Sequence, residues 1–450
     1  MGSMAAPPCH LVAVPYPGRS HVNAMLNLCR LLAARDGVAI TVVVTEEWLG
    51  LLGAPAALPN LGPRVRFEAI PNVIPSEHGR ASDMLGFLEA VYARMAAPFE
   101  RLLDRLAAPQ AIVADVSCRG PSPSARGGAC RATMFAVQYS FHRLPPAPAG
   151  GGAFPDGTDP CLIEDYIPGT KSIRFTDLAP THTNAAMLDK ILEAYSSVRK
   201  AQCIILTSFQ ELESDAIGAL RQELPCPVYA AGPCIPFMAL QERKANPDGD
   251  GYMAWLDAQP AGSVLYISLG SFLSVSAAQF DEIAGGLAES KVRFLWVLCD
   301  ADALSRVRGL TGGGDSAGLV VPWTDQLRVL CHPSVRGFFT HCGMNSTLEA
   351  VYAGVPMLTL PIAFDQPTNS RLVAEVWKTG LGLKEMARGD GVIGREEIAA
   401  AVERLMRPDS ADGADMRRRA AVLKHAARAA SEEGGSSWKD VTSFIHFISH

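Results

Sequence analysis

The residues best suited to chemistry gather in one stretch, residues 323–366. Here a small-residue loop, HCGMNS at 341–346, follows an apolar run at 335–340 and precedes a helical pattern at 347–352. A strand, a tight loop and a helix N-terminus together form an anion site, because unpaired N–H groups and the helix dipole point at one spot. The pattern therefore predicts that this loop binds phosphate.

Side chains near this loop suit a nucleotide. Asn345 or Ser346 can cap the predicted helix, and Glu349 lies near its first turn. A carboxylate close to phosphate is repelled unless it binds hydroxyl groups, so a ribose diol is its natural partner. Trp323 offers a flat face on which a base can stack. Taken alone, Trp323 and Glu349 would be a packing residue and a helix-dipole charge, but together they indicate a nucleotide-sugar site.

A second candidate is His21, in the segment PGRSHVNAML. It follows the first apolar run and opens the first helical pattern, where α/β folds present catalytic groups. Imidazole suits proton transfer because its ordinary pKa of ~6.5 lies near the working pH of most enzymes. A lone histidine at such a place is more often a capping or packing residue, so His21 by itself leaves catalysis open.

The elements that position these residues follow the same alternating pattern of strands and helices in both halves of the chain. Nearly all-apolar runs, typical of buried parallel strands, alternate with helical patterns. Strands are predicted at residues 10–15, 38–45, 65–70, 111–114 and 203–207, then at 264–269, 293–298, 319–322, 335–340 and 356–360. A polar stretch at 241–251 separates the halves. We therefore predict an α/β fold with an N-terminal domain at 1–240, a linker at 241–252 and a second domain at 253–436.

One segment departs from this alternation of strands and helices. Residues 118–131, CRGPSPSARGGACR, place prolines and glycines where a βαβ unit calls for an apolar helix. In GC-rich codons the neighbouring reading frame can encode PWAVAVGARRGVP, an apolar helix start followed by a loop. We hypothesise a compensated frame shift here, with an irregular loop as the alternative. Sequencing the transcript tests it: an uninterrupted frame coding for this text, shared with close relatives, would contradict the hypothesis.

Composition excludes several classes of protein. The 450 residues are 48% hydrophobic and carry a net charge of −6, so the chain can bury a core and has no basic footprint for nucleic acid. No apolar run is long enough to span a membrane, and the N-terminus does not read as a signal peptide. The eleven cysteines contain no C-x-x-C pair, which argues against a zinc site or disulfide framework. We expect a cytoplasmic protein without a metal.

The 323–366 stretch resembles the signature box of plant UDP-glycosyltransferases, which move a sugar from a UDP-sugar onto small lipophilic acceptors. The matching residues keep the spacing of the box: Trp323, Gln326, Leu330, His332, His341, Cys342, Gly343, Asn345, Ser346, Glu349, Gly354, Val355, Pro356, Pro361, Asp365 and Gln366. The resemblance extends over nearly the whole chain, including Ser271 and the region of His21. It implies the GT-B fold, in which two Rossmann-like domains face a cleft, and a final helix at 437–450 that packs back on the first domain.

The resemblance also implies roles for individual residues. The uracil would stack on Trp323, the ribose would be held by Glu349, and the sugar hydroxyls by Asp365 and Gln366. The diphosphate would be bound by Ser271, His341, Asn345 and Ser346. Gln326, Gly343 and Met344 would also belong to the donor site. Met344 departs from the family, which normally has Trp there, so we expect an effect on donor affinity or sugar preference. A terminal Gln in the box favours UDP-glucose, with no further cofactor.

By the same resemblance, His21 is the general base that deprotonates the acceptor, and Asp115 holds its imidazole. The reaction would be an in-line displacement with inversion, giving a glucoside or glucose ester of a small plant metabolite. We expect a monomer whose partners are the acceptor and the UDP-sugar. The leading alternative is a relative that binds UDP-sugar or acceptor without turnover, and a UDP-sugar epimerase is a weaker one. An NAD dehydrogenase is disfavoured because no G-x-G-x-x-G follows a strand.

Overall fold

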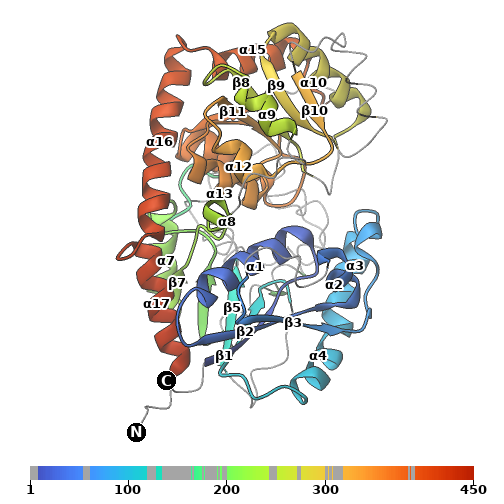
Figure 1. Ribbon diagram of the computed structural model, residues 1–450, viewed down its shortest axis with the longest axis vertical. Helices are drawn as coiled ribbons and strands as arrows, with labels where there is room; N and C mark the ends of the chain where they lie inside the picture. The colour runs from blue at the N-terminus through green and yellow to red at the C-terminus, as the bar shows by residue number, and fades with distance from the viewer. Residues whose placement is uncertain are drawn as a thin grey trace.

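Two parallel sheets, each built from one half of the chain, form the two ends of the molecule (Figure 1). The computed structural model describes residues 9–53, 61–118, 128–133, 164, 167–174, 177, 190, 193–194, 200–242, 251–270, 275–298, 303, 307, 318–383, 386 and 391–450. The first sheet has the order β3-β2-β1-β4-β5-β6-β7, formed by β1 (Cys9–Val14), β2 (Val38–Thr45), β3 (Val65–Ile70), β4 (Ala111–Asp115), β5 (Gly128–Thr133), β6 (Cys203–Leu206) and β7 (Val228–Ala230). The second has the order β10-β9-β8-β11-β12-β13, formed by β8 (Val264–Ser268), β9 (Arg293–Val297), β10 (Gly318–Val321), β11 (Val335–Thr340), β12 (Met357–Thr359) and β13 (Gly380–Gly382).

Helices cover and connect the sheets. In the first half they are α1 (Arg19–Ala33), α2 (Glu46–Leu52), the 3₁₀ turn η2 (Glu77–Gly79), α3 (Met84–Arg94), α4 (Ala96–Leu103), α7 (Ser214–Glu223) and α8 (Ala239–Glu242). In the second half they are α9 (Gly251–Asp257), α10 (Ala277–Ser290), α12 (Gln326–Leu330), α13 (Met344–Ala353), α14 (Gln366–Arg371), the π-helical turn η8 (Leu372–Val376), α15 (Arg395–Met406), α16 (Ala411–Ser431) and α17 (Ser436–Ser449).

The sequence explains why these strands are central. In β2, VAITVVVT, every residue except Ala39 is buried, as expected for a strand covered on both faces. Helix α1 presents Met25, Leu28 and Leu32 to the sheet at helical spacing, and all three are buried. The ten predicted strands are confirmed to within a few residues of their ends.

The strand order creates one switch point in each sheet. Strand β1 pairs in parallel with both β2 and β4, and β8 pairs in parallel with both β9 and β11. At such a point the connections leave in opposite directions, so a crevice opens beyond the carboxyl ends of the two strands. His21, in the first turn of α1, follows β1, Asp115 is the last residue of β4, and His341 lies in the loop after β11.

Three strands were missing from the predictions, and one helix begins earlier than predicted. Strand β5 starts at Gly128, inside the irregular 118–131 segment, β7 is the three-residue Val228–Ala230, and β13 consists of Gly-Leu-Gly. Of that segment, residues 119–127 lie outside the described part, as do 243–250 of the predicted linker. Helix α9 begins at Gly251, so the linker prediction was too long by two residues at this end.

The last two helices connect the halves. Helices α16 and α17 run along one side of the molecule from the second sheet to the first (Figure 1). The Asp440 side chain of α17 accepts hydrogen bonds from the backbone N–H of Ala230 in β7 and from Arg221, each at 2.7 Å. The Phe444 ring packs edge-on against Tyr229 at a centroid distance of 5.7 Å. The C-terminal helix therefore lies on the first sheet, with α16 on the second half.

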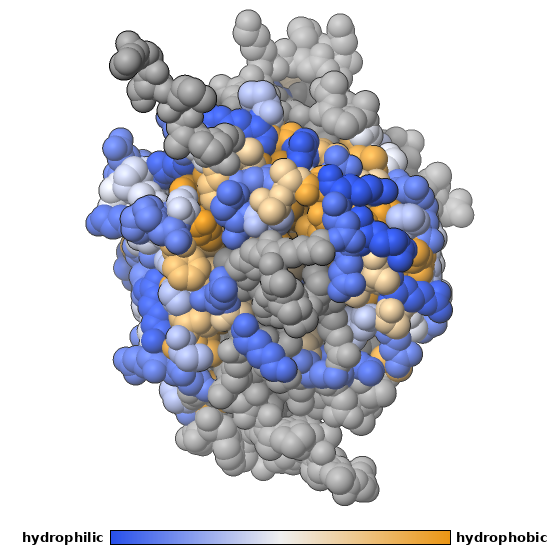
Figure 2. Space-filling model, turned by 90° about the horizontal axis from the view of Figure 1, so that it is seen from below, coloured by the Kyte–Doolittle hydropathy of each residue, from blue (hydrophilic) through white to orange (hydrophobic). Residues whose placement is uncertain are grey.

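The described surface mixes polar and apolar side chains. Figure 2 shows one face, on which hydrophobic residues are interspersed with hydrophilic ones. Among the helices that the structure describes, none combines the length and hydropathy that crossing a bilayer requires.

Candidate active site

The first half of the site is a hydrogen-bonded pair at the switch point of the first sheet. Helix α1 begins at Arg19, so His21 stands in its first turn, and Asp115 is the last residue of β4. His21 Nδ1 donates to Asp115 Oδ2 at 2.8 Å, and Asp115 Oδ1 accepts the backbone N–H of Ser117 at 2.8 Å. The carboxylate thus fixes the imidazole with Nε2 as the nitrogen left to take a proton.

The surroundings of His21 act on its pKa in both directions. Burial lowers the pKa of His21, but the neighbouring Asp115 carboxylate raises it by more, so the net pKa lies above its ordinary value. Arg80 lowers this pKa and Asp365 raises it. The side chain of His21 is 18% exposed, so an acceptor can reach it.

The second half of the site is the N-terminus of α13, at the switch point of the second sheet. The helix begins at Met344 with Gly343 as its N-cap, so the predicted start at Thr347 was three residues late. Asn345 and Ser346 lie in the first turn and cannot cap their own helix, which corrects the capping prediction. The first bond of the helix runs from Thr347 N to Gly343 O, which leaves three first-turn N–H groups for an anion.

His341 lies between two glycines beside this helix start. A Cβ atom on Gly270 would come within 2.9 Å of its Nε2, and one on Gly343 within 2.6 Å. Burial lowers the pKa of His341 to about 4, so the imidazole is neutral at physiological pH. Its Nδ1 is buried and has no hydrogen-bond partner within the described chain. A buried polar atom of this kind needs a partner, which a bound ligand can supply.

The Met344 side chain is buried. It is 3% exposed and packs in the core between the two halves, and Thr207 of the first half donates a weak bond to its sulfur at 3.9 Å. The expected effect of Met344 on donor affinity or sugar preference stays a prediction. What Met344 offers the anion site is its backbone N–H.

A polar network and an exposed ring adjoin the anion site. Gln326 Nε2 donates to Glu349 Oε2 at 2.7 Å and to Ser346 Oγ at 2.9 Å. Burial raises the pKa of Glu349 to about 7, against the lowering effect of the Gln326 bond. Glu349 lies in the second turn of α13, one turn later than predicted. The Trp323 side chain is 62% exposed, so one face of an indole is open to a planar ring.

Asp365 and Gln366 come at the start of α14. Asp365 Oδ2 accepts a bond from Asn369 Nδ2 at 2.6 Å. Gln366 Oε1 accepts the backbone N–H groups of Ile362 and Ala363, at 2.8 and 3.0 Å. The Gln366 amide oxygen therefore shapes its own loop, and only its NH₂ group remains for a sugar hydroxyl.

The two halves of the site meet directly. Asn345 Nδ2 donates to the backbone carbonyl of Ser20, the residue before His21, at 2.9 Å. The structure thereby brings together His21, Asp115, Met344, Asn345 and Asp365, with His341 and Gly343 at the same loop. Asn345 Oδ1 is buried without a partner in the described chain. Ser271 lies outside the described residues.

Sequence reasoning missed three residues next to His21: Tyr16, Glu77 and Arg80. The Tyr16 ring lies 5.0 Å from the His21 ring, and Arg80 pairs with Glu77 at 2.9 Å. The available signal was an anion and a cation at i, i+3, Glu77 and Arg80, in the segment after β3.

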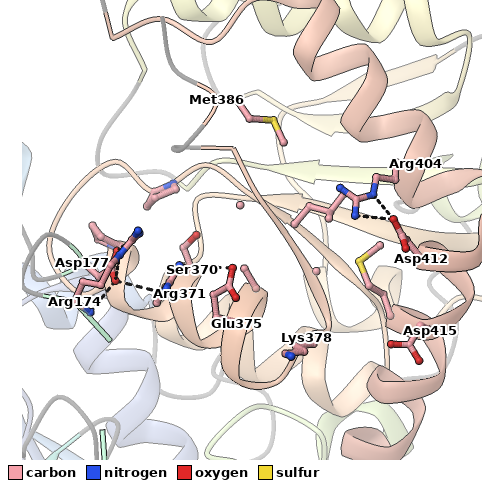
Figure 3. A pocket seen from close by; sticks show the side chains of 17 residues that line it. Arg174, Asp177, Ser370, Arg371, Glu375, Lys378, Met386, Arg404, Asp412 and Asp415 are labelled. Carbon is pink, nitrogen blue, oxygen red and sulfur yellow. Dashed lines mark hydrogen bonds and ion pairs between the residues drawn. The ribbon is translucent and has the colours of Figure 1, made fainter. Parts of the chain in front are cut away.

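A separate cavity of about 400 Å³ lies behind α14 (Figure 3). Its charged side chains pair with each other: Arg404 contacts Asp412 at 2.6 Å, and Arg371 lies 3.5 Å from Asp177. Thr368 also donates to the backbone carbonyl of Asp177 at 2.9 Å. These contacts tie α14 to the first half of the chain. Among the described residues, no group of three or more His, Cys, Asp or Glu could hold a metal ion.

A helix start with three first-turn N–H groups available to an anion thus lies next to a His–Asp pair, where the two halves of the chain meet. Comparisons with known proteins identify the family. The family model described as UDP-glucoronosyl and UDP-glucosyl transferase matches residues 186–417. UDP-glycosyltransferase 87A2 of Arabidopsis thaliana is 42% identical, over 98% of this chain and 97% of the relative. The chain therefore belongs to the plant UDP-glycosyltransferase family and is a glycosyltransferase.

Solved structures support the same assignment. Phytolacca americana UGT2, complexed with UDP-2fluoro-glucose and pterostilbene, superposes with a TM-score of 0.83 at 27% identity, over 99% of this chain and 100% of that one. Medicago truncatula UGT71G1, complexed with UDP-glucose, gives a TM-score of 0.82 at 26% identity, over 98% and 99%. The predicted GT-B fold is confirmed by these neighbours and by the two parallel sheets.

Proposed function

We propose that this enzyme transfers glucose from UDP-glucose, with inversion at the anomeric carbon, to a hydroxyl or carboxyl group of a small lipophilic plant metabolite. The observation that carries the proposal is the His21–Asp115 pair at 2.8 Å, one residue away from the contact between Ser20 and Asn345 of the donor loop. The base and the anion site are therefore neighbours, as a direct transfer requires.

In the proposed reaction His21 Nε2 takes the proton of an acceptor hydroxyl as the oxygen attacks the anomeric carbon. The new C–O bond forms on one face of the sugar while the bond to UDP breaks on the other, and UDP leaves with the electron pair. Asp115 stabilises the resulting imidazolium. The first-turn N–H groups of α13 stabilise the charge that develops on the diphosphate, so no cofactor beyond the donor is needed.

The donor would bind along α13. Trp323 stacks on the uracil, and Glu349, held by Gln326, accepts the ribose hydroxyls. His341 and Asn345 have buried polar atoms without partners, which supports contacts to the donor there. Asp365 and the Gln366 NH₂ group would hold sugar hydroxyls. Complexes of the similar Medicago and Phytolacca enzymes with UDP-glucose and UDP-2fluoro-glucose support glucose as the sugar.

The intact His21–Asp115 contact favours turnover over the alternative of a binding protein without activity. Asp115 borders the irregular 118–131 segment, yet both of its carboxylate oxygens accept hydrogen bonds, one from His21 and one from the backbone N–H of Ser117. A segment that disrupted the acceptor half would have been expected to displace β4.

The test is product analysis with UDP-glucose and a panel of phenols, terpenoid alcohols and carboxylic acids. Proton NMR of the product should give a β-anomeric signal, because inversion of the α-linked donor is required. UDP-galactose and UDP-glucuronate serve as donor controls. Binding of UDP-glucose without product from any acceptor class would favour the inactive relative, and a product that retains the α configuration would contradict the mechanism.

A further inference from the structure

A buried ion pair, Arg80 with Glu77, lies close to His21, whose pKa Arg80 lowers. Arg80 Nη2 contacts Glu77 Oε1 at 2.9 Å, and the two side chains are only 6% and 12% exposed. The guanidinium also lies 5.8 Å from the centroid of the Phe87 ring. Removing two charges from water is costly, and a hydrophobic pair of similar volume is often as stable, so such a pair is weak evidence for a purely stabilising role.

The pair contacts the start of the helix that carries His21. A Cβ atom on Gly18, the N-cap of α1, would overlap the Arg80 guanidinium, so the guanidinium lies directly against this backbone. Burial raises the pKa of Glu77, and both Arg80 and the backbone N–H of Arg19 act against that rise. Since Gly18 offers no side-chain cap, the Glu77 carboxylate supplies the negative charge at this helix N-terminus.

The pair also reaches His21 through an aromatic ring. Arg80 interacts with the phenol of Tyr16, whose ring lies 5.0 Å from the His21 ring at 55°. Tyr16 is buried and packs edge-on against Phe87 at 6.1 Å. Displacing Arg80 would therefore release both the helix start and the ring that support the imidazole.

We propose that Arg80 is a positioning residue for His21, which fixes the first turn of α1 and places a permanent positive charge beside the imidazole. This inference rests on the proposed role of His21 as general base. Arg80 does not touch the substrate in this scheme, because its guanidinium is buried and paired with Glu77.

The charges around His21 explain why such a residue is useful. The charged groups that act on the imidazole are Asp115 at the end of β4, Asp365 before α14 and Arg80 after η2. The Tyr16 ring, in the loop after β1, packs against the imidazole, while Glu77 and Arg19 act on Arg80. Two carboxylates favour the imidazolium, which cannot act as a base. Arg80 opposes them and so keeps more His21 neutral at a given pH, as the direction of its effect on the His21 pKa supports.

The experiment measures the His21 pKa directly in Arg80→Met, by NMR titration of protein labelled with ¹³C at the histidine ring. The His21→Ala variant assigns the signal. We expect the His21 pKa in Arg80→Met to rise by about half a pH unit or more, since one nearby positive charge is lost. The acid limb of the kcat/KM profile should shift upward by the same amount, and Arg80→Lys should restore both.

Two further variants separate charge from packing. Glu77→Gln removes the opposite charge, so it should shift the His21 pKa downward. The double variant Glu77→Gln/Arg80→Met leaves no unpaired buried charge and should fold where Arg80→Met does not, with a smaller upward shift. Arg64→Met, which removes an exposed partner of Asp36, is the matched control and should shift nothing.

An unchanged His21 pKa in both Arg80→Met and the double variant would overturn the proposal, as would an equal loss of activity at every pH. The titration needs no turnover. If wild-type protein has no activity while the His21 pKa responds to Arg80 as expected, the proposed function fails and the positioning role stands.

Discussion

We predict that Glu349, the proposed ribose ligand, makes the binding of UDP-glucose dependent on pH. Burial raises the pKa of this carboxyl from 4.5 to about 7, so the unliganded protein holds a mixture of neutral and ionised Glu349 near neutral pH. Ribose hydroxyls donate to a carboxylate, so the donor binds the ionised form and lowers the pKa in the complex. Affinity should therefore rise with pH and level off above the pKa of the free protein.

The size of the effect follows from the ionised fraction. With a pKa of about 7, roughly one molecule in eleven is ionised at pH 6 and roughly ten in eleven at pH 8. The dissociation constant for UDP-glucose should therefore be about tenfold lower at pH 8 than at pH 6. His341, with a pKa of about 4, stays neutral over this range and does not contribute.

Isothermal titration calorimetry measures this effect. UDP-glucose is the ligand, because the terminal phosphate of UDP itself titrates near pH 6. The His21→Ala variant is the background, because His21 is a second titratable group of the site with a raised pKa. Proton release, read from buffers with different ionisation enthalpies, should accompany binding at pH 6. Glu349→Gln should bind more weakly and independently of pH. A pH dependence that persists in Glu349→Gln would refute the reasoning.

Three substitutions test other parts of the donor site. Trp323→Ala removes a stacking face, so the dissociation constant for UDP should rise about 10-fold to 100-fold. The midpoint of thermal unfolding should barely change, because the ring is exposed. Unchanged UDP affinity would exclude stacking. Gly343→Ala adds a Cβ that crowds His341 without backbone strain, since φ of Gly343 is −62°. Calorimetry should therefore show weaker UDP binding although the protein still folds. Wild-type UDP affinity in this variant would mean that the His341 ring moves aside without cost. Met344→Trp overfills a buried position, so the free energy of unfolding in denaturant should fall by about 1–3 kcal/mol. Tighter UDP binding with unchanged stability would instead mean that the side chain at this position contacts the donor.

Much of the fold was predictable because its strands are buried on both faces. Runs such as VAITVVVT are apolar throughout, and their alternation with helical patterns leaves few arrangements other than parallel sheets. The three strands that escaped prediction lack this signal. Strand β13 is Gly-Leu-Gly, β7 is only Val-Tyr-Ala, and β5 is GACRAT, so none contains the β-branched run that marks a central strand.

The position of the site was predictable from loops, but the direction of its side chains was not. The spacing of His341, Asn345 and Glu349 locates the anion site, because a strand, a loop and a helix must follow each other there. The start of α13 was predicted too late, since Asn345 and Ser346 look like caps and Gly343 supplies the cap position instead. Met344 turns into the core between the two halves, which no local pattern specifies.

Contacts between distant segments carried no sequence signal at all. Asn345 meets Ser20 across 325 positions, and Asp177 meets Thr368 across 191. The Arg80–Glu77 pair is visible as an i, i+3 spacing, yet its closeness to Gly18 depends on how the loop after β3 folds over α1. Such long-range placement is decided by packing rather than by periodicity.

The most direct test of the central claim compares wild type with His21→Ala in acceptor-dependent UDP release from UDP-glucose, with UDP affinity measured in parallel. For a phenolic acceptor we predict a loss of at least about 100-fold in kcat with unchanged UDP affinity, because general-base catalysis is removed. A carboxylic acid acceptor is already ionised and needs no base, so the loss of kcat in His21→Ala should be smaller with such an acceptor. Equal turnover in the two proteins with the phenol would contradict His21 as the base.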